Sequence, residues 1–128
     1  MILDSSALIA VIMSEAGHEK LLAKIRSAAP VGIGAPTVVE SAIVLSRRFG
    51  RDPFPLLLDL LEEMDVVIIP FTEEHCFAAM RAFMRYGKGR HPAALNFGDC
   101  MVYAVASAAN QPLLFIGGDF SQTDLIPA

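Results

Sequence analysis

The 128-residue chain has the length of a single domain, and with 54% hydrophobic and 19% charged residues its composition excludes intrinsic disorder. No apolar run approaches the roughly 18 residues of a membrane span, and the start lacks a signal-peptide pattern, so we expect a cytoplasmic protein. The two cysteines, Cys76 and Cys100, lack metal-ligand spacing, which argues against a zinc site or a disulfide framework; we expect both to be buried.

The net charge of −4 at first argues against nucleic acid as a partner, because phosphate-binding proteins are usually basic. The distribution of the charges weakens this objection. Seven of the ten Lys and Arg residues lie between Arg47 and Arg90. Four carboxylates gathered at one site would by themselves account for the net charge.

The first half of the chain predicts two strands and four helices. The strands are short apolar runs, and the helices repeat apolar residues every three or four positions. Pro30 and Gly50 end two of the helices. In chain order we expect a strand at 1–3, helices at 6–13 and 15–28, a strand at 31–35, and helices at 37–49 and 54–64.

The second half continues the alternation. A β-branched run between Asp65 and Pro70 predicts a buried strand, and Gly117-Gly118 stops the last strand before a short tail. We expect a strand at 66–69, a helix at 72–86, a loop at 87–93, a helix at 96–109 and a strand at 113–116. This order predicts a parallel central sheet covered by helices on both faces, a three-layer α/β/α sandwich forming one domain over residues 1–128.

Four acidic side chains are expected at the carboxyl edge of this sheet, where parallel α/β folds form their sites. Two follow strands, and two lie three residues after a possible helix N-cap. They are Asp4 and Asp119 after the first and last strands, and Glu40 and Asp99 after Thr37 and Asn96, respectively.

Each acid also has a purely structural interpretation. Glu40 and Asp99 fit the capping-box pattern, and the helix dipole favours an acid in a first turn. Asp4 could be a cap and Asp119 a solvated loop acid. Convergence favours a cation site, because acids at one edge repel one another unless a cation compensates them. Mg²⁺ or Mn²⁺ prefers such oxygen ligands, and can generate hydroxide for attack on a phosphodiester.

Four segments of the chain resemble one known family. They are Met-Ile-Leu-Asp-Ser-Ser at 1–6, Pro-Thr-Val-Val-Glu at 36–40, Leu-Asn-Phe-Gly-Asp at 95–99 and Phe-Ile-Gly-Gly-Asp at 115–119. Together they resemble the PIN domain, and within it the VapC ribonuclease toxins; the third segment is the most specific. The resemblance implies that Asp4, Glu40, Asp99 and Asp119 coordinate the metal and position the attacking water, with Ser6 and Asn96 in supporting places.

The resemblance further implies a Mg²⁺- or Mn²⁺-dependent endoribonuclease, the toxin of a toxin-antitoxin system, with a cognate VapB-type antitoxin and an RNA substrate. Many PIN domains carry a Thr and a further Asp where this chain has Phe115 and Gly117. Whether one or two metal ions bind therefore stays open.

A basic rim could hold the RNA phosphates. The candidates are Arg85, Lys88 and Arg90, in and beside the loop before the Asp99 helix, although a merely solvated loop fits them equally well. A second cluster, Arg47, Arg48 and Arg51, suits a helix C-terminus and could also hold the acidic tail of an antitoxin. The apolar helices exceed what one small core needs, which favours a homodimer and a groove for an antitoxin helix.

Two other functions fit part of this pattern. Phosphoryl-transfer domains of the HAD or response-regulator kind also place an Asp after the first strand, but HAD enzymes need a second acid where this chain has Ser6, and response regulators need an acidic pair and a late Lys that this chain lacks. A catalytically inert PIN-fold interaction module, in which the acids are only caps, is the remaining alternative.

Overall fold

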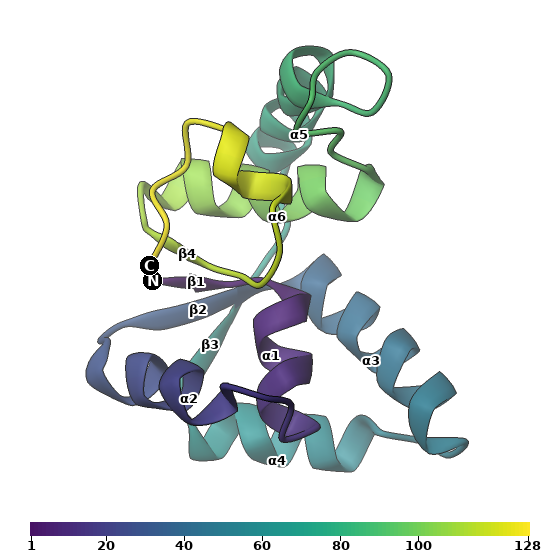
Figure 1. Ribbon diagram of the computed structural model, residues 1–128, viewed down its shortest axis with the longest axis vertical. Helices are drawn as coiled ribbons and strands as arrows, with labels where there is room; N and C mark the ends of the chain where they lie inside the picture. Colours follow the sequence, from purple (N-terminus) through teal and green to yellow (C-terminus); the bar gives the residue numbers. More distant parts are fainter.

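The computed structural model describes residues 1–128, and a four-stranded parallel sheet lies at its centre (Figure 1). The strand order is β3-β2-β1-β4, so the first strand of the chain lies inside the sheet. Ile2 of β1 is paired with Gly32 on one side and with Leu113 on the other. The strands are β1 (Ile2–Leu3), β2 (Val31–Gly34), β3 (Val66–Ile69) and β4 (Leu113–Leu114).

Helices cover both faces of the sheet (Figure 1). One layer contains α1 (Ser5–Ile12), α2 (His18–Ser27), α3 (Ala35–Phe49) and α4 (Phe54–Glu63). The other contains α5 (Glu73–Tyr86), α6 (Phe97–Ala109) and the short 3₁₀ helix η1 (Asp119–Gln122). The expected three-layer α/β/α sandwich is therefore confirmed.

Two hydrophobic cores hold the layers together, one on each face. Successive strand residues point to opposite faces, and accordingly Ile2 packs in the α5–α6 core while Leu3 packs in the α1–α4 core. The helices contribute fully buried side chains such as Leu8, Leu45 and Val102. Burial of each large apolar side chain contributes about 1.5–3 kcal/mol to folding.

Several boundaries differ from those expected. Helix α2 begins at His18 rather than at 15, because Gly17, with φ +86°, turns the chain just before it. Strand β4 ends at Leu114 rather than at 116. Instead of an irregular tail, the chain then forms η1, which Phe120 anchors by packing against Phe115 with 5.3 Å between ring centroids.

The strand expected at 66–69 is present with these bounds, but the expectation that it is buried is wrong. Strand β3 lies at the edge of the sheet, where Val67 is 58% and Ile68 41% exposed. β-Branched residues favour a strand in either position, so composition did not distinguish an edge from a centre. The expectation that both cysteines are buried is also wrong. Cys100 is buried, but Cys76 is exposed near the start of α5. No helix is both long and apolar enough to cross a membrane.

Candidate active site

Asp4 lies at the end of β1 and forms the N-cap of α1. Its carboxylate accepts a 3.1 Å hydrogen bond from the backbone N–H of Ser6 and a second one from the Ser6 hydroxyl. The same hydroxyl accepts a 2.9 Å hydrogen bond from the backbone N–H of Ile116 in the loop after β4. The buried Asp4 is therefore held in one orientation, and Ser6 connects it to the segment that leads to Asp119.

Glu40 lies in the second turn of α3, because that helix begins earlier than expected. The N-cap is Gly34, Pro36 occupies the first turn, and Thr37 is buried inside the helix. The interpretation of Thr37 and Glu40 as a capping box is therefore wrong. Proline favours the first turn of a helix, so Pro36 makes α3 begin before Thr37 instead of at it. Glu40 has no role in capping α3.

The Glu40 carboxylate instead reaches across to α6. A Cβ atom placed on Gly98 would lie only 2.9 Å from its Oε1 atom. Glycine at this position thus permits the carboxylate of α3 to lie against the first turn of α6, one residue from Asp99. This contact brings two of the predicted acids to the same edge.

Asp99 has the capping role that its sequence predicted. The Asn96 side chain accepts a 2.9 Å hydrogen bond from the Asp99 N–H, and Asp99 Oδ2 accepts one of 2.9 Å from the Asn96 N–H. Its Oδ1 atom has no hydrogen-bond partner in the protein. The capping box therefore fixes the carboxylate and leaves one oxygen free for a ligand.

The four acids interact electrostatically. Burial raises the pKa of Asp99, the backbone of Asn96 opposes the shift, and the charges of Asp119 and Asp4 add to it. Burial likewise raises the pKa of Glu40, with further contributions from Asp4 and Asp99 that the Ser5 hydroxyl partly offsets. The fold therefore concentrates negative charge at the carboxyl edge of the sheet.

The acids at this edge fit a hard divalent cation that keeps most of its water ligands, such as Mg²⁺. No three Asp, Glu, His or Cys side chains form a ready-made group of metal ligands, so the protein has no closed coordination cage. Mg²⁺ does not need one, because it keeps several waters and is usually bound through one or two carboxylates. The free Asp99 oxygen and the repulsion among the acids match such a hydrated ion.

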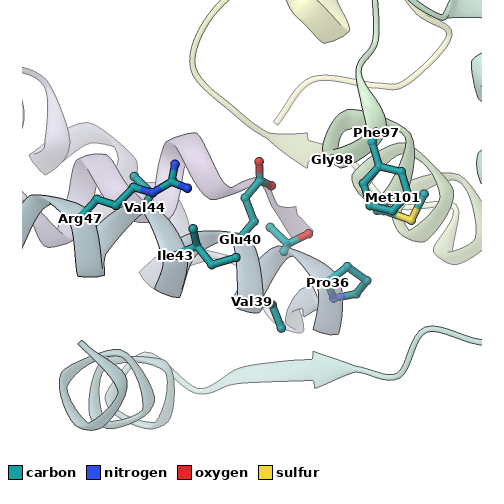
Figure 2. Close-up of a pocket in the computed structure, with 10 residues that line it drawn as sticks. Pro36, Val39, Glu40, Ile43, Val44, Arg47, Phe97, Gly98 and Met101 are labelled. Carbon is teal, nitrogen blue, oxygen red and sulfur yellow. The ribbon is translucent and has the colours of Figure 1, made fainter. Parts of the chain in front are cut away.

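A cleft of about 480 Å³ opens beside Glu40, between α3 and α6 (Figure 2). Figure 2 shows Glu40, Ile43 and Arg47 along α3, with Phe97 and Met101 of α6 across from them. Sequence reasoning did not assign Arg47 and Phe97 to this place. The spacing offered a signal, since Arg47 follows Glu40 by two helical turns and so lies on the same helix face.

Comparison with known proteins agrees with this geometry. The PIN domain family matches residues 1–125. The chain is 50% identical over 127 residues to ribonuclease VapC36 of Mycobacterium tuberculosis, covering 98% of this chain and 91% of that protein. It is 40% identical over 126 residues to ribonuclease VapC of Mycolicibacterium smegmatis, covering 98% and 97%. The chain belongs to the VapC ribonuclease family of PIN-domain proteins.

Solved structures share the fold of this VapC-family protein. VapC20 of Mycobacterium tuberculosis, described as a sarcin-ricin loop cleaving toxin, superposes with a TM-score of 0.76 at 18% identity, covering 99% of this chain and 97% of that one. VapBC2 of Rickettsia felis, bound to a DNA fragment from its promoter, gives a TM-score of 0.77 at 16% identity, covering 99% and 96%. The predicted family and fold are thus confirmed.

The basic residues predicted for RNA binding differ in their surroundings. Arg85 is engaged: it forms an ion pair of 3.0 Å with Asp124 and lies over the Tyr86 ring. Arg90 lies over the Phe83 ring at 5.6 Å, and Lys88 is exposed. In this VapC-family protein Arg85 thus ties the C-terminal segment to α5, a role that the sequence did not indicate, and its RNA role stays a prediction.

Proposed function

We propose that this chain is a Mg²⁺- or Mn²⁺-dependent endoribonuclease and the toxin of a toxin-antitoxin pair. The observation that carries the proposal is the gathering of acids at one edge of the sheet, where Asp4 follows β1 and the Glu40 carboxylate lies against Gly98, next to Asp99. The charge of Asp119 also acts on Asp99. The names of the relatives support an action on RNA, since proteins 50% and 40% identical to this chain are called VapC ribonucleases.

Each acid would have a distinct part in this chemistry. Asp4, oriented by Ser6, and Asp99, oriented by Asn96, would hold the metal ion through their oxygens. When bound, such an ion lowers the pKa of a coordinated water and stabilises charge on the phosphodiester. Glu40, whose carboxylate lies against Gly98 beside Asp99 and caps no helix, would accept the proton of the attacking water. Asp119 would complete the acidic edge.

Cleavage of total RNA tests this proposal. Antitoxin-free protein is incubated with RNA in Mg²⁺, in Mn²⁺ and in excess EDTA, beside identically prepared Asp99→Asn and Asp59→Asn variants. Asp59 is an exposed acid on α4 and serves as the matched control. We expect discrete cuts that require metal, persist in Asp59→Asn and vanish in Asp99→Asn. Cuts of wild-type strength in Asp99→Asn would refute the mechanism.

One observation favours the inert interaction module as a second candidate. Asp99 and Asp4 both act as caps, in agreement with a structural role. Glu40 does not fit this alternative, because it caps nothing and lies against Gly98. Absence of cleavage in every metal, together with retained binding to an antitoxin, would favour the inert module.

We also propose that the protein forms a homodimer and binds a VapB-type antitoxin. Helix α5 and its neighbours surround an apolar hollow of about 800 Å³, and Phe77, Met80 and Met84 are 50%, 65% and 61% exposed. Exposed apolar patches of this kind mark interaction surfaces. Sedimentation should therefore give a dimer for the wild-type protein and a monomer for Met84→Glu. A wild-type monomer would refute the dimer.

A further inference from the structure

Asp119 is the acid of the site whose position the backbone before it restrains least. It is exposed and is the first residue of η1. Gly117, with φ +109°, and Gly118 stand between it and the end of the sheet, and glycine lets the backbone take many conformations. The only hydrogen bond that ties residues 115–118 to the body of the domain is the one from Ile116 to Ser6. The position of Asp119 therefore depends on contacts that follow it in the chain.

Two contacts after Asp119 fasten this segment to the helices. Phe120 is buried in the α5–α6 core, so η1 lies across α6 (Figure 1). Four residues later, the Asp124 carboxylate accepts a 2.6 Å hydrogen bond from the Tyr103 hydroxyl of α6 and pairs with Arg85 of α5 at 3.0 Å. A single anchor would let the segment rotate about the buried ring. The second anchor, at Asp124, removes this freedom.

Tyr103 is the stronger of the two partners of Asp124. Its side chain is 8% exposed, and its ring packs on Tyr86 with 5.7 Å between the centroids, so its hydroxyl has little freedom to move. A hydrogen bond to a charged acceptor is of the stronger kind. The side chains of the Arg85–Asp124 ion pair are 64% and 50% exposed, and exposed ion pairs contribute little. The bond from Tyr103 therefore supplies most of the restraint.

Helix α6 connects this second anchor to the acids at the sheet edge. Tyr103 follows Asp99 by four residues, and residues four apart lie on the same face of a helix. The face that presents Asp99 to the acidic edge thus also holds the segment 119–124. Burial raises the pKa of Asp99, and the charge of Asp119 raises it further, in agreement with two carboxylates held near one another.

We propose that the bond between Tyr103 and Asp124 is a clamp that sets Asp119 against Asp99, so that Tyr103 and Asp124 are positioning residues for RNA cleavage. The inference rests on the proposed function, because it names what completes the acidic edge. The clamp contacts neither the metal ion nor the RNA, and it acts through Asp119 alone.

Binding of Mn²⁺ tests the clamp without measuring cleavage. Titration calorimetry gives the Kd of Mn²⁺ for the wild-type protein, Tyr103→Phe, Asp119→Asn and the double variant, at a temperature where circular dichroism shows each to be folded. Tyr103→Phe should raise the Kd roughly threefold to tenfold, the range that the net strength of one hydrogen bond allows. Asp119→Asn should raise it at least as much. In the Asp119→Asn background, Tyr103→Phe should have no further effect.

The Asp124 side chain offers a conservative rescue and a matched control. Asp124→Ala removes the acceptor and should raise the Kd as Tyr103→Phe does. Asp124→Asn keeps an oxygen for the Tyr103 hydroxyl and should restore most of the affinity. Glu15→Ala is the control, because it also removes a carboxylate from a close ion pair, of 2.7 Å with Arg48, and it should leave the Kd unchanged. Arg85→Gln should change the Kd little.

The dependence of cleavage on metal should change in parallel. At low Mn²⁺, Tyr103→Phe should cut RNA more slowly than the wild-type protein, and excess Mn²⁺ should restore most of the rate, because added metal compensates for weaker binding. A rate that stays low at every Mn²⁺ concentration, with an unchanged Kd, would overturn the clamp.

Failure of the clamp and failure of the proposed function give different results. If Tyr103→Phe or Asp119→Asn binds Mn²⁺ as the wild-type protein does, while Asp99→Asn loses binding and cleavage, the clamp is wrong and the nuclease stands. An effect of Tyr103→Phe that persists in full in the Asp119→Asn background also overturns the clamp, since it would then act by another route. If the wild-type protein neither binds Mn²⁺ nor cuts RNA, the proposed function fails, and the clamp fails with it.

Discussion

The hydroxyl of Ser6 accepts a hydrogen bond of 2.9 Å from the backbone N–H of Ile116, which lies 110 positions further along the chain. Because the same hydroxyl donates to Asp4, Ser6→Ala removes both contacts at once. We expect a loss of about 1–3 kcal/mol in the free energy of unfolding and a larger fractional loss of cleavage. Urea denaturation and the RNA assay measure the two effects.

The control for this substitution is Ser46→Ala, since the Ser46 hydroxyl donates only to a backbone carbonyl within its own helix. It should change neither quantity appreciably. Equal cleavage by Ser6→Ala and wild-type protein would show that the orientation of Asp4 does not depend on this hydroxyl.

Gly98→Ala should separate activity from stability. The added Cβ would lie 2.9 Å from Glu40 Oε1, and the flexible carboxylate can move away at little cost. Alanine also favours a helix over glycine by up to about 1 kcal/mol. We therefore expect an unchanged or higher melting temperature with at least tenfold slower cleavage. If the effect acts through Glu40, Gly98→Ala should have no further effect on cleavage in a Glu40→Gln background.

Divalent ions should stabilise the wild-type protein. A ligand bound only by the folded state contributes about 2.7 kcal/mol at a concentration one hundred times its Kd. We expect Mg²⁺ and Mn²⁺ to raise the melting temperature by several degrees, and Asp99→Asn to abolish the rise.

Without metal, Asp99→Asn should melt at or above the wild-type temperature, because a raised pKa means that the charged Asp99 is destabilising. An inert module would show no metal-dependent rise.

The pair of Tyr103 and Asp124 should give stability a defined pH window. Tyr103 donates a 2.6 Å hydrogen bond to Asp124. This bond is the main cause that lowers the pKa of Asp124, whereas burial and the Asp124 hydrogen bond raise the pKa of Tyr103 to about 12. A lowered carboxyl pKa gives stability that is lost as the pH falls below about 4. A raised phenol pKa gives stability that is lost as the pH rises from about 10 toward 12.

Tyr103→Phe tests this window. Its difference from the wild-type protein in free energy of unfolding should be constant from about pH 5 to 9 and should shrink outside these limits on both sides. Urea titrations across this range measure it. A difference that does not vary with pH would show that this hydrogen bond shifts neither the pKa of Asp124 nor that of Tyr103.

Local sequence patterns predicted the order of the strands and helices along the chain, because apolar residues recur in the helices and form short runs in the strands. They predicted the capping box at Asn96 and Asp99 correctly, since both partners lie within four residues of one another. They failed at Thr37, where the adjacent Pro36 started the helix earlier. They could not show that β3 is an edge strand, because sheet order depends on which distant strands pair.

The positions of the four acids could be predicted from the sequence, but the contacts around them could not. Placing an acid after a strand end or in a first helical turn needs only local information. The contact of Glu40 with Gly98 and the ion pair of Arg85 with Asp124 join residues far apart in the chain. The same holds for the cleft, whose walls come from α3 and α6. Such relationships become visible only in three dimensions.

The position of β1 between β2 and β4 has a consequence for the synthesis of the protein. A growing chain on the ribosome can pair β1 with β2 early, but it cannot pair β1 with β4 before Leu114 has been translated. The hydrogen bond from Ile116 to Ser6 and the arrival of Asp119 come later still. In a protein proposed to cut RNA, the four acids thus cannot act together before Asp119 has been translated and has left the ribosome.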